Sequence, residues 1–239
     1  MIKISELNIA VLCVCTLTGC MHQPELTLLD VQAPLTLAVA PALNHSGSED
    51  FDPVRVADLM ASELTHFPGV KVIPVSRTLA QLASEGKARV ESPAHALQVL
   101  DRLGADGMVV FAVTEYDPYW PPVVGISAQI FGHGPLGGTA FDPVSSSRQS
   151  SPVESRVGKL PRAECQRIFN GREKQVEYEI RDFARERDAE DSPHGWRKFL
   201  ATQEDFLRFC CHSVLGELIR QEVTHVVAQV ERRNEGAQR

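Results

Sequence analysis

The chain has 239 residues, of which 43% are hydrophobic, and a formal net charge of −7. This length is enough to bury the core of one large domain or two small ones. The mildly acidic balance argues against nucleic acid as a partner, because nucleic-acid-binding surfaces are basic. It argues equally against electrostatic binding to anionic lipid head groups.

The first twenty residues have the layout of a secretory signal. Lys3 precedes an apolar run, Ile9–Val14, which is too short for a permanent membrane helix. The tetrapeptide Leu17-Thr18-Gly19-Cys20 follows, and it resembles the lipobox of bacterial lipoproteins. The resemblance implies that a signal peptide, residues 1–19, is cut between Gly19 and Cys20 and that the Cys20 thiol carries a lipid. An ordinary cleaved signal with a chance Gly-Cys pair is the alternative.

Residues 20–34 carry few structural signals and are expected to form a tether of at most about 45 Å. The run Leu26–Leu29 could instead pack on the folded body and shorten it. Within the lipoprotein resemblance, Met21 after the cysteine implies sorting to the outer membrane, on its periplasmic side. Stable attachment by two or more acyl chains agrees with lipid-binding energetics.

Strand and helix patterns alternate between Leu35 and Val113. The predicted elements are a buried strand at 35–40, a helix opened by Asp52-Pro53, a strand at 70–74, a helix capped by Ser76, a helix from Ser92-Pro93 to Gly104, and an apolar strand at 108–113. This order is typical of an α/β fold with right-handed crossovers. Residues 123–131 alternate apolar and small or polar side chains, which predicts a half-exposed antiparallel strand. We therefore expect a mixed sheet of about four to five strands with covering helices.

The connection before this last strand holds Pro118, Pro121 and Pro122 and is rich in aromatic residues. Tyr116, Tyr119 and Trp120 form the candidate contact patch, since rigid aromatic side chains supply contact area at low entropic cost. The alternative is a turn folded onto the core.

Five motifs in residues 35–131 resemble the α/β domain shared by the N-terminal part of TolB and by the curli-secretion lipoprotein CsgG. They are Val39-Ala40-Pro41, Asn44–Gly47, the amphipathic helix Val54–Phe67, Val70–Pro74, and Leu103-Gly104-Ala105-Asp106. The resemblance implies a domain that binds partners or assembles with copies of itself. It supplies no catalytic residues.

The C-terminal part divides into three predicted segments. Residues 132–162 are rich in Gly, Ser and Pro and are expected to form a flexible loop, residues 163–232 a helical extension, and residues 233–239 a disordered charged tail. We expect the helices to pack on the open face of the sheet. This part resembles a group of uncharacterised planctomycete lipoproteins in Tyr178, Phe183-Ala184, Ser192–Arg197 and Phe209–His212. That resemblance implies no activity.

Beyond the signal segment and Cys20, three cysteines remain: Cys165, Cys210 and Cys211. A disulfide from Cys165 to Cys210 or Cys211 is chemically allowed after export, and the alternative is that they are small core residues. Cys210-Cys211-His212 is not expected to bind a metal, because adjacent helical side chains point about 100° apart.

The remaining motifs do not predict a cofactor. The glycine-rich run 132–138 lacks the Gly-Lys-Ser/Thr ending of a phosphate-binding loop, and the histidines lack zinc-hydrolase spacing. The sequence thus favours a non-catalytic, lipid-anchored binding or assembly protein of the outer membrane with a protein partner or a homo-oligomeric state. The alternatives are a small-ligand sensor or carrier, with a pocket between the sheet and the C-terminal helices, and last an enzyme without a recognisable motif.

Overall fold

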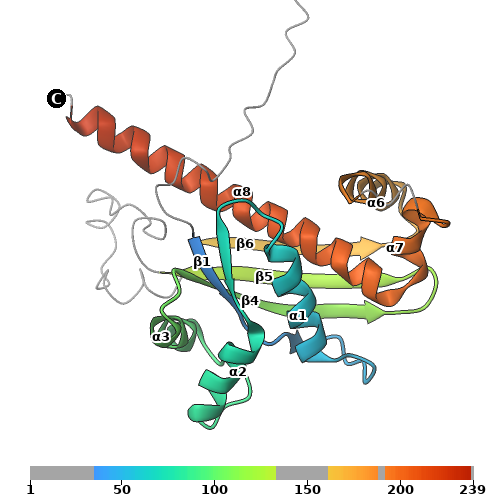
Figure 1. Ribbon diagram of the computed structural model, residues 1–239, viewed down its shortest axis with the longest axis horizontal. Helices are drawn as coiled ribbons and strands as arrows, with labels where there is room; N and C mark the ends of the chain where they lie inside the picture. Colours follow the sequence, from blue (N-terminus) through green and yellow to red (C-terminus); the bar gives the residue numbers. More distant parts are fainter. Residues whose placement is uncertain (1–34, 133–160, 188–191, 238–239) are drawn as a thin grey trace, which may run out of the picture.

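The computed structural model describes residues 35–132, 161–187 and 192–237, with side chains up to Thr224 in the last range (Figure 1). The strands are β1 (Leu35–Val39), β2 (Leu43–Asn44), β3 (Val70–Ile73), β4 (Gly107–Asp117), β5 (Val123–Gly132) and β6 (Ala163–Asn170). The helices are α1 (Pro53–Leu64), α2 (Val75–Ser84), α3 (Pro93–Leu103), α6 (Lys174–Glu186), the 3-10 turn η3 (Gly195–Arg197), α7 (Lys198–Ala201) and α8 (Gln203–Ala237).

One mixed sheet organises the described residues. Its strand order is β3-β1-β4-β5-β6, with the short β2 paired to β4. β1 pairs in parallel with β3 and β4, whereas the β4–β5 and β5–β6 pairs are antiparallel. The predicted α/β class with a mixed sheet, covering helices and a C-terminal helix packed on the sheet is confirmed.

Local chemistry explains where α1 and α3 begin and end. The Asp52 carboxylate accepts hydrogen bonds from the N–H groups of Val54 and Arg55, and Ser92 accepts one from the N–H of His95. Gly104 ends α3 in the left-handed conformation, with a φ of 65°. The predicted Ser76 cap is wrong, because α2 begins at Val75 after Pro74 and has no side-chain cap.

Two predicted boundaries near the C-terminus are wrong. Residues 163–170 belong to strand β6 and not to a helical extension. Their side chains alternate, with Ala163, Cys165 and Phe169 buried and the residues between them more exposed, so β6 can extend the sheet beside β5. The expected tail from residue 233 is helical as far as Ala237, because α8 continues without a break.

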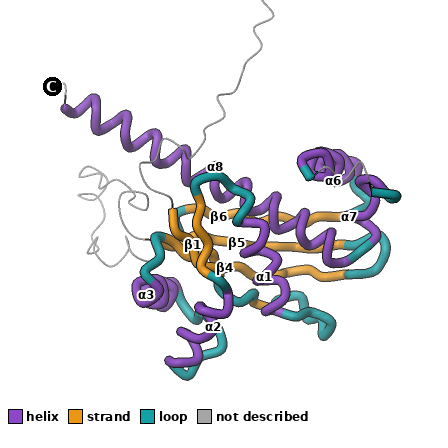
Figure 2. Tube along the Cα trace, in the orientation of Figure 1, coloured by secondary structure: helices purple, strands orange, loops and turns teal. Residues whose placement is uncertain are grey.

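Helices cover both faces of the sheet (Figure 2). On one face α1 and α8 pack over the larger core, which includes Leu37, Val109 and Phe209. On the other face α2 and α3 enclose a smaller core around Met108 and Leu100. Alternate residues of β1 and β4 enter the two cores in turn, which is why these strands read as nearly continuous apolar runs.

The β4–β5 turn lies at the end of the sheet opposite to Leu35 (Figure 1). The parallel β1–β4 register puts Leu37 beside Gly107, at the start of β4. β4 then continues for 11 residues, or about 33 Å, to the turn. The chain therefore enters the described fold at one pole and presents the β4–β5 turn at the other.

Candidate functional site

The β4–β5 turn carries two of the three aromatic residues of the candidate contact patch on its surface. Tyr119 is 73% exposed and Trp120 is 69% exposed. The N–H of Tyr119 donates a hydrogen bond to the Asp117 carboxylate at 3.1 Å, which holds the start of the turn. The Trp120–Pro121 peptide bond is cis. Two large aromatic side chains that are each more than two-thirds exposed are typical of surfaces that bind other proteins.

Tyr116 differs from the other two aromatic residues because it packs against the body. Its ring meets Phe51 edge-on, with centroids 5.5 Å apart and an interplanar angle of 77°. Burial, and then the nearby Asp50 charge, raise the pKa of the Tyr116 hydroxyl. Tyr116 therefore packs against the folded body next to the turn. The exposed part of the candidate contact patch consists of Tyr119 and Trp120.

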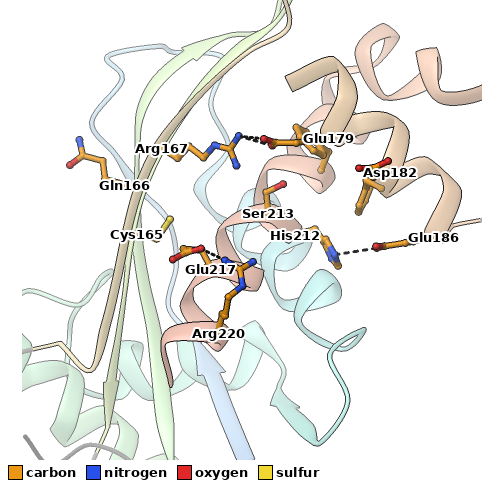
Figure 3. Close-up of a pocket in the computed structure, with 12 residues that line it drawn as sticks. Cys165, Gln166, Arg167, Glu179, Asp182, Glu186, His212, Ser213, Glu217 and Arg220 are labelled. Atoms are coloured by element: carbon orange, nitrogen blue, oxygen red, sulfur yellow. Dashed lines mark hydrogen bonds and ion pairs between the residues drawn. The ribbon is translucent and has the colours of Figure 1, made fainter. Parts of the chain in front are cut away.

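A pocket of about 520 Å³ lies between β6, α6 and α8 (Figure 3). Cys165 and Arg167 point from β6 toward the helices, whereas Gln166 points away. The side chains of Phe183 and Phe209, which are almost fully buried, give it an apolar floor. The remaining lining is polar or charged: Glu179, Asp182 and Glu186 from α6, and His212, Ser213, Glu217 and Arg220 from α8.

Both arginines that line the pocket already have partners. Arg167 Nη2 donates to both oxygens of Glu179, at 2.7 and 2.6 Å. Arg220 pairs with Glu217, one turn before it on α8. Glu186 approaches His212 Nε2 at 3.8 Å. The positive charges of the lining are therefore neutralised locally, and carboxylates are left in excess.

His212 also faces a buried carboxylate behind the pocket. Its Nδ1 lies 3.5 Å from Glu63 Oε2, and Glu63, on α1, is completely buried. Arg187 also hydrogen-bonds Glu63, and Arg208 Nη1 lies 3.5 Å from Glu63 Oε1. Burial opposes ionisation of Glu63, but the hydrogen bonds from His212 and Arg187 outweigh it and lower the pKa of the carboxyl. This cluster joins α1 to α6 and α8.

All three cysteines of the described residues are free and buried. Cys165 lines the pocket, whereas Cys210 and Cys211 belong to α8 and are buried in the larger core. Burial raises the pKa of each thiol, so all three favour the neutral form at pH 7. The disulfide from Cys165 stays a prediction. Within residues 35–132, 161–187 and 192–237, no three His, Cys, Asp or Glu side chains are placed to hold one metal ion.

The sequence singled out four of the pocket residues, namely Cys165, Phe183, Phe209 and His212, but not the others. A signal was present on α6, where Glu179, Asp182 and Glu186 recur at spacings of three and four and so share one helical face. The predicted signal segment, the predicted lipid acceptor Cys20 and the predicted tether lie outside the described residues. Among the described helices, none combines the length and apolar character that a membrane crossing requires.

Comparisons with known proteins find solved structures of low similarity. No known protein family and no curated protein matches the sequence. The lipoprotein GNA1162 of Neisseria meningitidis superposes with a TM-score of 0.42 at 16% identity, over 67% of this chain and 99% of that one. The C-terminal domain of LpoB from Salmonella enterica gives 0.40 at 8% identity, over 58% of this chain and 84% of that one. The hypothetical protein CT253 of Chlamydia trachomatis gives 0.34 at 11% identity, over 83% of this chain and 96% of that one. These values carry no conclusion about function.

Proposed function

We propose that this chain is a lipid-anchored protein of the bacterial outer membrane that faces the periplasm and binds a protein partner or a second copy of itself, without catalysis. The observation that carries the proposal is the exposed Tyr119–Trp120 pair at the pole opposite to Leu35. A lipid on Cys20 would hold the other pole toward the membrane. The aromatic pair would then be displayed toward the periplasm and away from the lipid surface.

The chemistry of the described side chains supports a binding role. The thiols of Cys165, Cys210 and Cys211 are buried with raised pKa values, which suits core residues better than nucleophiles. Glu63 is ionised and held by hydrogen bonds, which suits a structural ion pair better than a general base.

Crosslinking in intact membranes tests the proposal. We expect the wild-type chain to give a crosslinked protein species that is lost in the double variant Tyr119→Ser/Trp120→Ser. Tyr178→Ser is the matched control, since Tyr178 is 59% exposed but lies on α6. Equal crosslinking in all three chains would refute the aromatic surface. The anchor is tested separately, because Cys20→Ala is expected to release the chain from the membrane fraction, and unchanged attachment would refute it.

The pocket favours a second candidate function, small-ligand binding by a sensor or carrier. Its volume of about 520 Å³ is within the range of ligand sites in proteins, and such sites are commonly lined by aromatic residues. It also lies between the sheet and the C-terminal helices. The test is a thermal-shift screen with a metabolite collection, in which a hit must lose its effect when Ser213→Phe fills the pocket.

A further inference from the structure

We propose that the outer edge of strand β6 binds an extended segment of a partner protein, which adds to the sheet as a further antiparallel strand. The backbone of the segment pairs with Gln166 and Ile168, and one of its side chains enters the pocket between β6, α6 and α8. The inference rests on the proposed function, because the segment belongs to a protein partner. It gives that partner a second contact region in addition to the Tyr119–Trp120 pair.

Strand β6 is the last strand of the sheet and has a partner strand on one side only. The N–H of Gly171 donates to the Pro122 carbonyl across the β5–β6 pair. Odd-numbered residues of β6 therefore direct their N–H and C=O groups toward β5, and even-numbered residues direct theirs outward. Glu164 agrees with this direction, because its N–H donates to Gln221 Oε1 of α8 at 3.1 Å.

The outward backbone groups in the middle of β6 have no partner among the described residues. Only the two ends are satisfied there, by the bond to the N–H of Glu164 and by a bond of 2.9 Å from the Glu173 N–H to the Asn170 carbonyl. Within the same ranges, no group bonds to the outward N–H and C=O of Gln166 and Ile168. An antiparallel segment satisfies both of these residues with two of its own, because each facing pair exchanges two hydrogen bonds.

The two edges of the sheet differ in the features that normally prevent strand addition. Strand β3 has only four residues, lies between Pro68 and Pro74, and carries the exposed Lys71. Strand β6 has eight residues with neither proline nor lysine, and Ile168 near its middle is 56% exposed. Short length, proline and lysine protect the edges of natural sheets, so β6 is the edge that accepts a further strand.

The pocket lies along this same edge of the sheet. Gln166 borders it although its side chain points away, so its backbone forms that part of the wall (Figure 3). Directly opposite residues of an antiparallel pair share one face of the sheet, and neighbours along a strand alternate. The segment residue opposite Arg167 therefore points to the pocket side, where a volume of about 520 Å³ has room for its side chain.

The surroundings of the edge define the occupant. Helix α6 lies on the outer side of β6 and forms a wall of the pocket (Figure 1). A second copy paired through its own β6 would bring its own α6 to the same place, whereas a single extended segment has no helix to accommodate. The segment residue opposite Ile168 is apolar, to cover that side chain, and the residue facing the pocket is polar, because most of the lining is polar or charged.

The test uses a fluorescein-labelled peptide, Thr-Ser-Val-Asn-Thr-Ser-Thr-amide, in which Val is opposite Ile168 and Asn faces the pocket. Fluorescence anisotropy with the detergent-solubilised full chain should show saturable binding. N-methylation of Val and of the Thr two residues after it removes the N–H groups directed at β6 and should weaken binding by about tenfold or more. The control peptide is methylated on Asn and on the Ser two residues after it, whose N–H groups point away from β6, and should bind within about twofold of the parent.

Variants of the chain test the same contact from the other side. Gln166→Pro removes an outward N–H but no bond to β5, a place where strands tolerate proline, and should weaken the peptide by about fivefold or more. Gln166→Ala is the matched control and should change binding by less than about twofold. Ser213→Phe, which fills the pocket, should weaken this peptide but not its analogue with Gly in place of Asn. Thermal melts check folding, and the methylated peptides decide on the wild-type chain even if Gln166→Pro does not fold.

Each result decides a specific point. No binding, or binding that the two methylated peptides weaken equally, overturns strand addition. A dimer of the full chain that dissociates when the peptide is added would show that a second copy occupies the edge, and would overturn the partner segment. Crosslinking in membranes separates this inference from the proposed function. A crosslinked species that is kept in Gln166→Pro but lost in Tyr119→Ser/Trp120→Ser refutes the β6 edge and leaves the proposed function intact, whereas peptide binding without any crosslinked species supports the edge and refutes the aromatic surface.

Discussion

The Glu63 carboxylate on α1 accepts a hydrogen bond from the Arg187 guanidinium at the end of α6, although 124 residues separate them in the chain. Arg208 and His212 of α8 approach the same carboxylate. Because Glu63 is completely buried, these groups take the place of the water it has lost. One carboxylate thus connects an early helix to two late ones.

Replacing Glu63 should weaken the whole fold. We expect Glu63→Gln to lower the free energy of unfolding by about 2–3 kcal/mol, because it removes charged hydrogen bonds to Arg187 and His212. Asp58→Asn, an exposed acid on the same helix, should change it by less than about 0.5 kcal/mol. Urea unfolding of both variants checks this, and equal stabilities would contradict a linking role for Glu63.

The contribution of Glu63 should also depend on pH. Its pKa is lower in the folded state than the value of about 4.3 expected in the unfolded chain. Its stabilisation is therefore fully present above the unfolded pKa and is lost as the pH falls through the folded pKa. The stability gap between wild type and Glu63→Gln should stay constant from about pH 8 to pH 6 and narrow below about pH 4. Urea midpoints across this range measure the gap, and a gap that widened in acid would have the wrong sign.

Arg162 and Glu222 form a second buried ion pair. Removing one partner and removing both are expected to have opposite effects on stability. Arg162 Nη2 donates to Glu222 Oε2 at 2.6 Å, and both side chains are at most 5% exposed. Among the described residues, Arg162 Nε and Nη1 and Glu222 Oε1 have no hydrogen-bond partner. Burial raises the pKa of Glu222 and lowers that of Arg162, so it opposes the charged form of each.

Arg162→Met alone should therefore cost about 3–5 kcal/mol, because it leaves Glu222 buried without a partner. Arg162→Met/Glu222→Leu should recover all of this loss, or exceed it by about 1–4 kcal/mol, because neither charge is then desolvated. Denaturant unfolding measures the free energy of unfolding of the two variants. If the double variant is as unstable as the single one, the attraction within the ion pair exceeds the cost of desolvating its charges.

Two glycines should respond in opposite directions to alanine. At Gly216, inside α8, a Cβ atom would meet nothing closer than the Phe67 ring at 3.9 Å. Gly216→Ala should therefore stabilise the fold by about 0.5–1 kcal/mol through helix propensity. At Gly132 a Cβ would lie 2.6 Å from the backbone oxygen of Asp106, so Gly132→Ala should destabilise the end of β5. Melting temperatures that moved in the same direction would contradict this contrast.

The thiols should be protected in the native state. Cys165, Cys210 and Cys211 are buried with raised pKa values, so iodoacetamide at pH 8 should leave them unmodified until the chain is unfolded. Peptide mass spectrometry measures each site. The same experiment detects the predicted disulfide, which would leave Cys165 unmodified even after unfolding without a reductant.

Local patterns were sufficient to predict the elements whose signals lie within one turn or one strand. Asp52-Pro53 and Ser92-Pro93 start helices as expected, because a cap acceptor and a proline act on their immediate neighbours. β6 was missed although its alternation was visible, because 8 residues between a glycine-rich segment and a helix do not reveal a partner strand. Pairing with β5 is a long-range property that alternation alone does not specify.

The pocket depends on tertiary structure even more strongly. Glu186 and His212 belong to different helices, and only the packing of α6 against α8 through Phe183 and Phe209 brings them together. No spacing in the sequence specifies that contact. In contrast, Tyr119 and Trp120 could be identified as candidates, because they lie within a short proline-containing turn whose placement follows from its two flanking strands. Whether that turn is exposed or folded onto the core was left open by the sequence.

The packing of α1 against α8 has a consequence for how the chain folds. Residues near the beginning and the end of the described fold share one core, so contacts between distant parts of the sequence are needed to complete that core. Contacts of such long sequence separation form slowly, since the chain between the two helices must close before the core is completed. A nascent chain lacking α8 would have no cover over β5 and β6 and would lack two of the groups that surround Glu63, Arg208 and His212. The larger core of the described fold should therefore close only once the last helix is available.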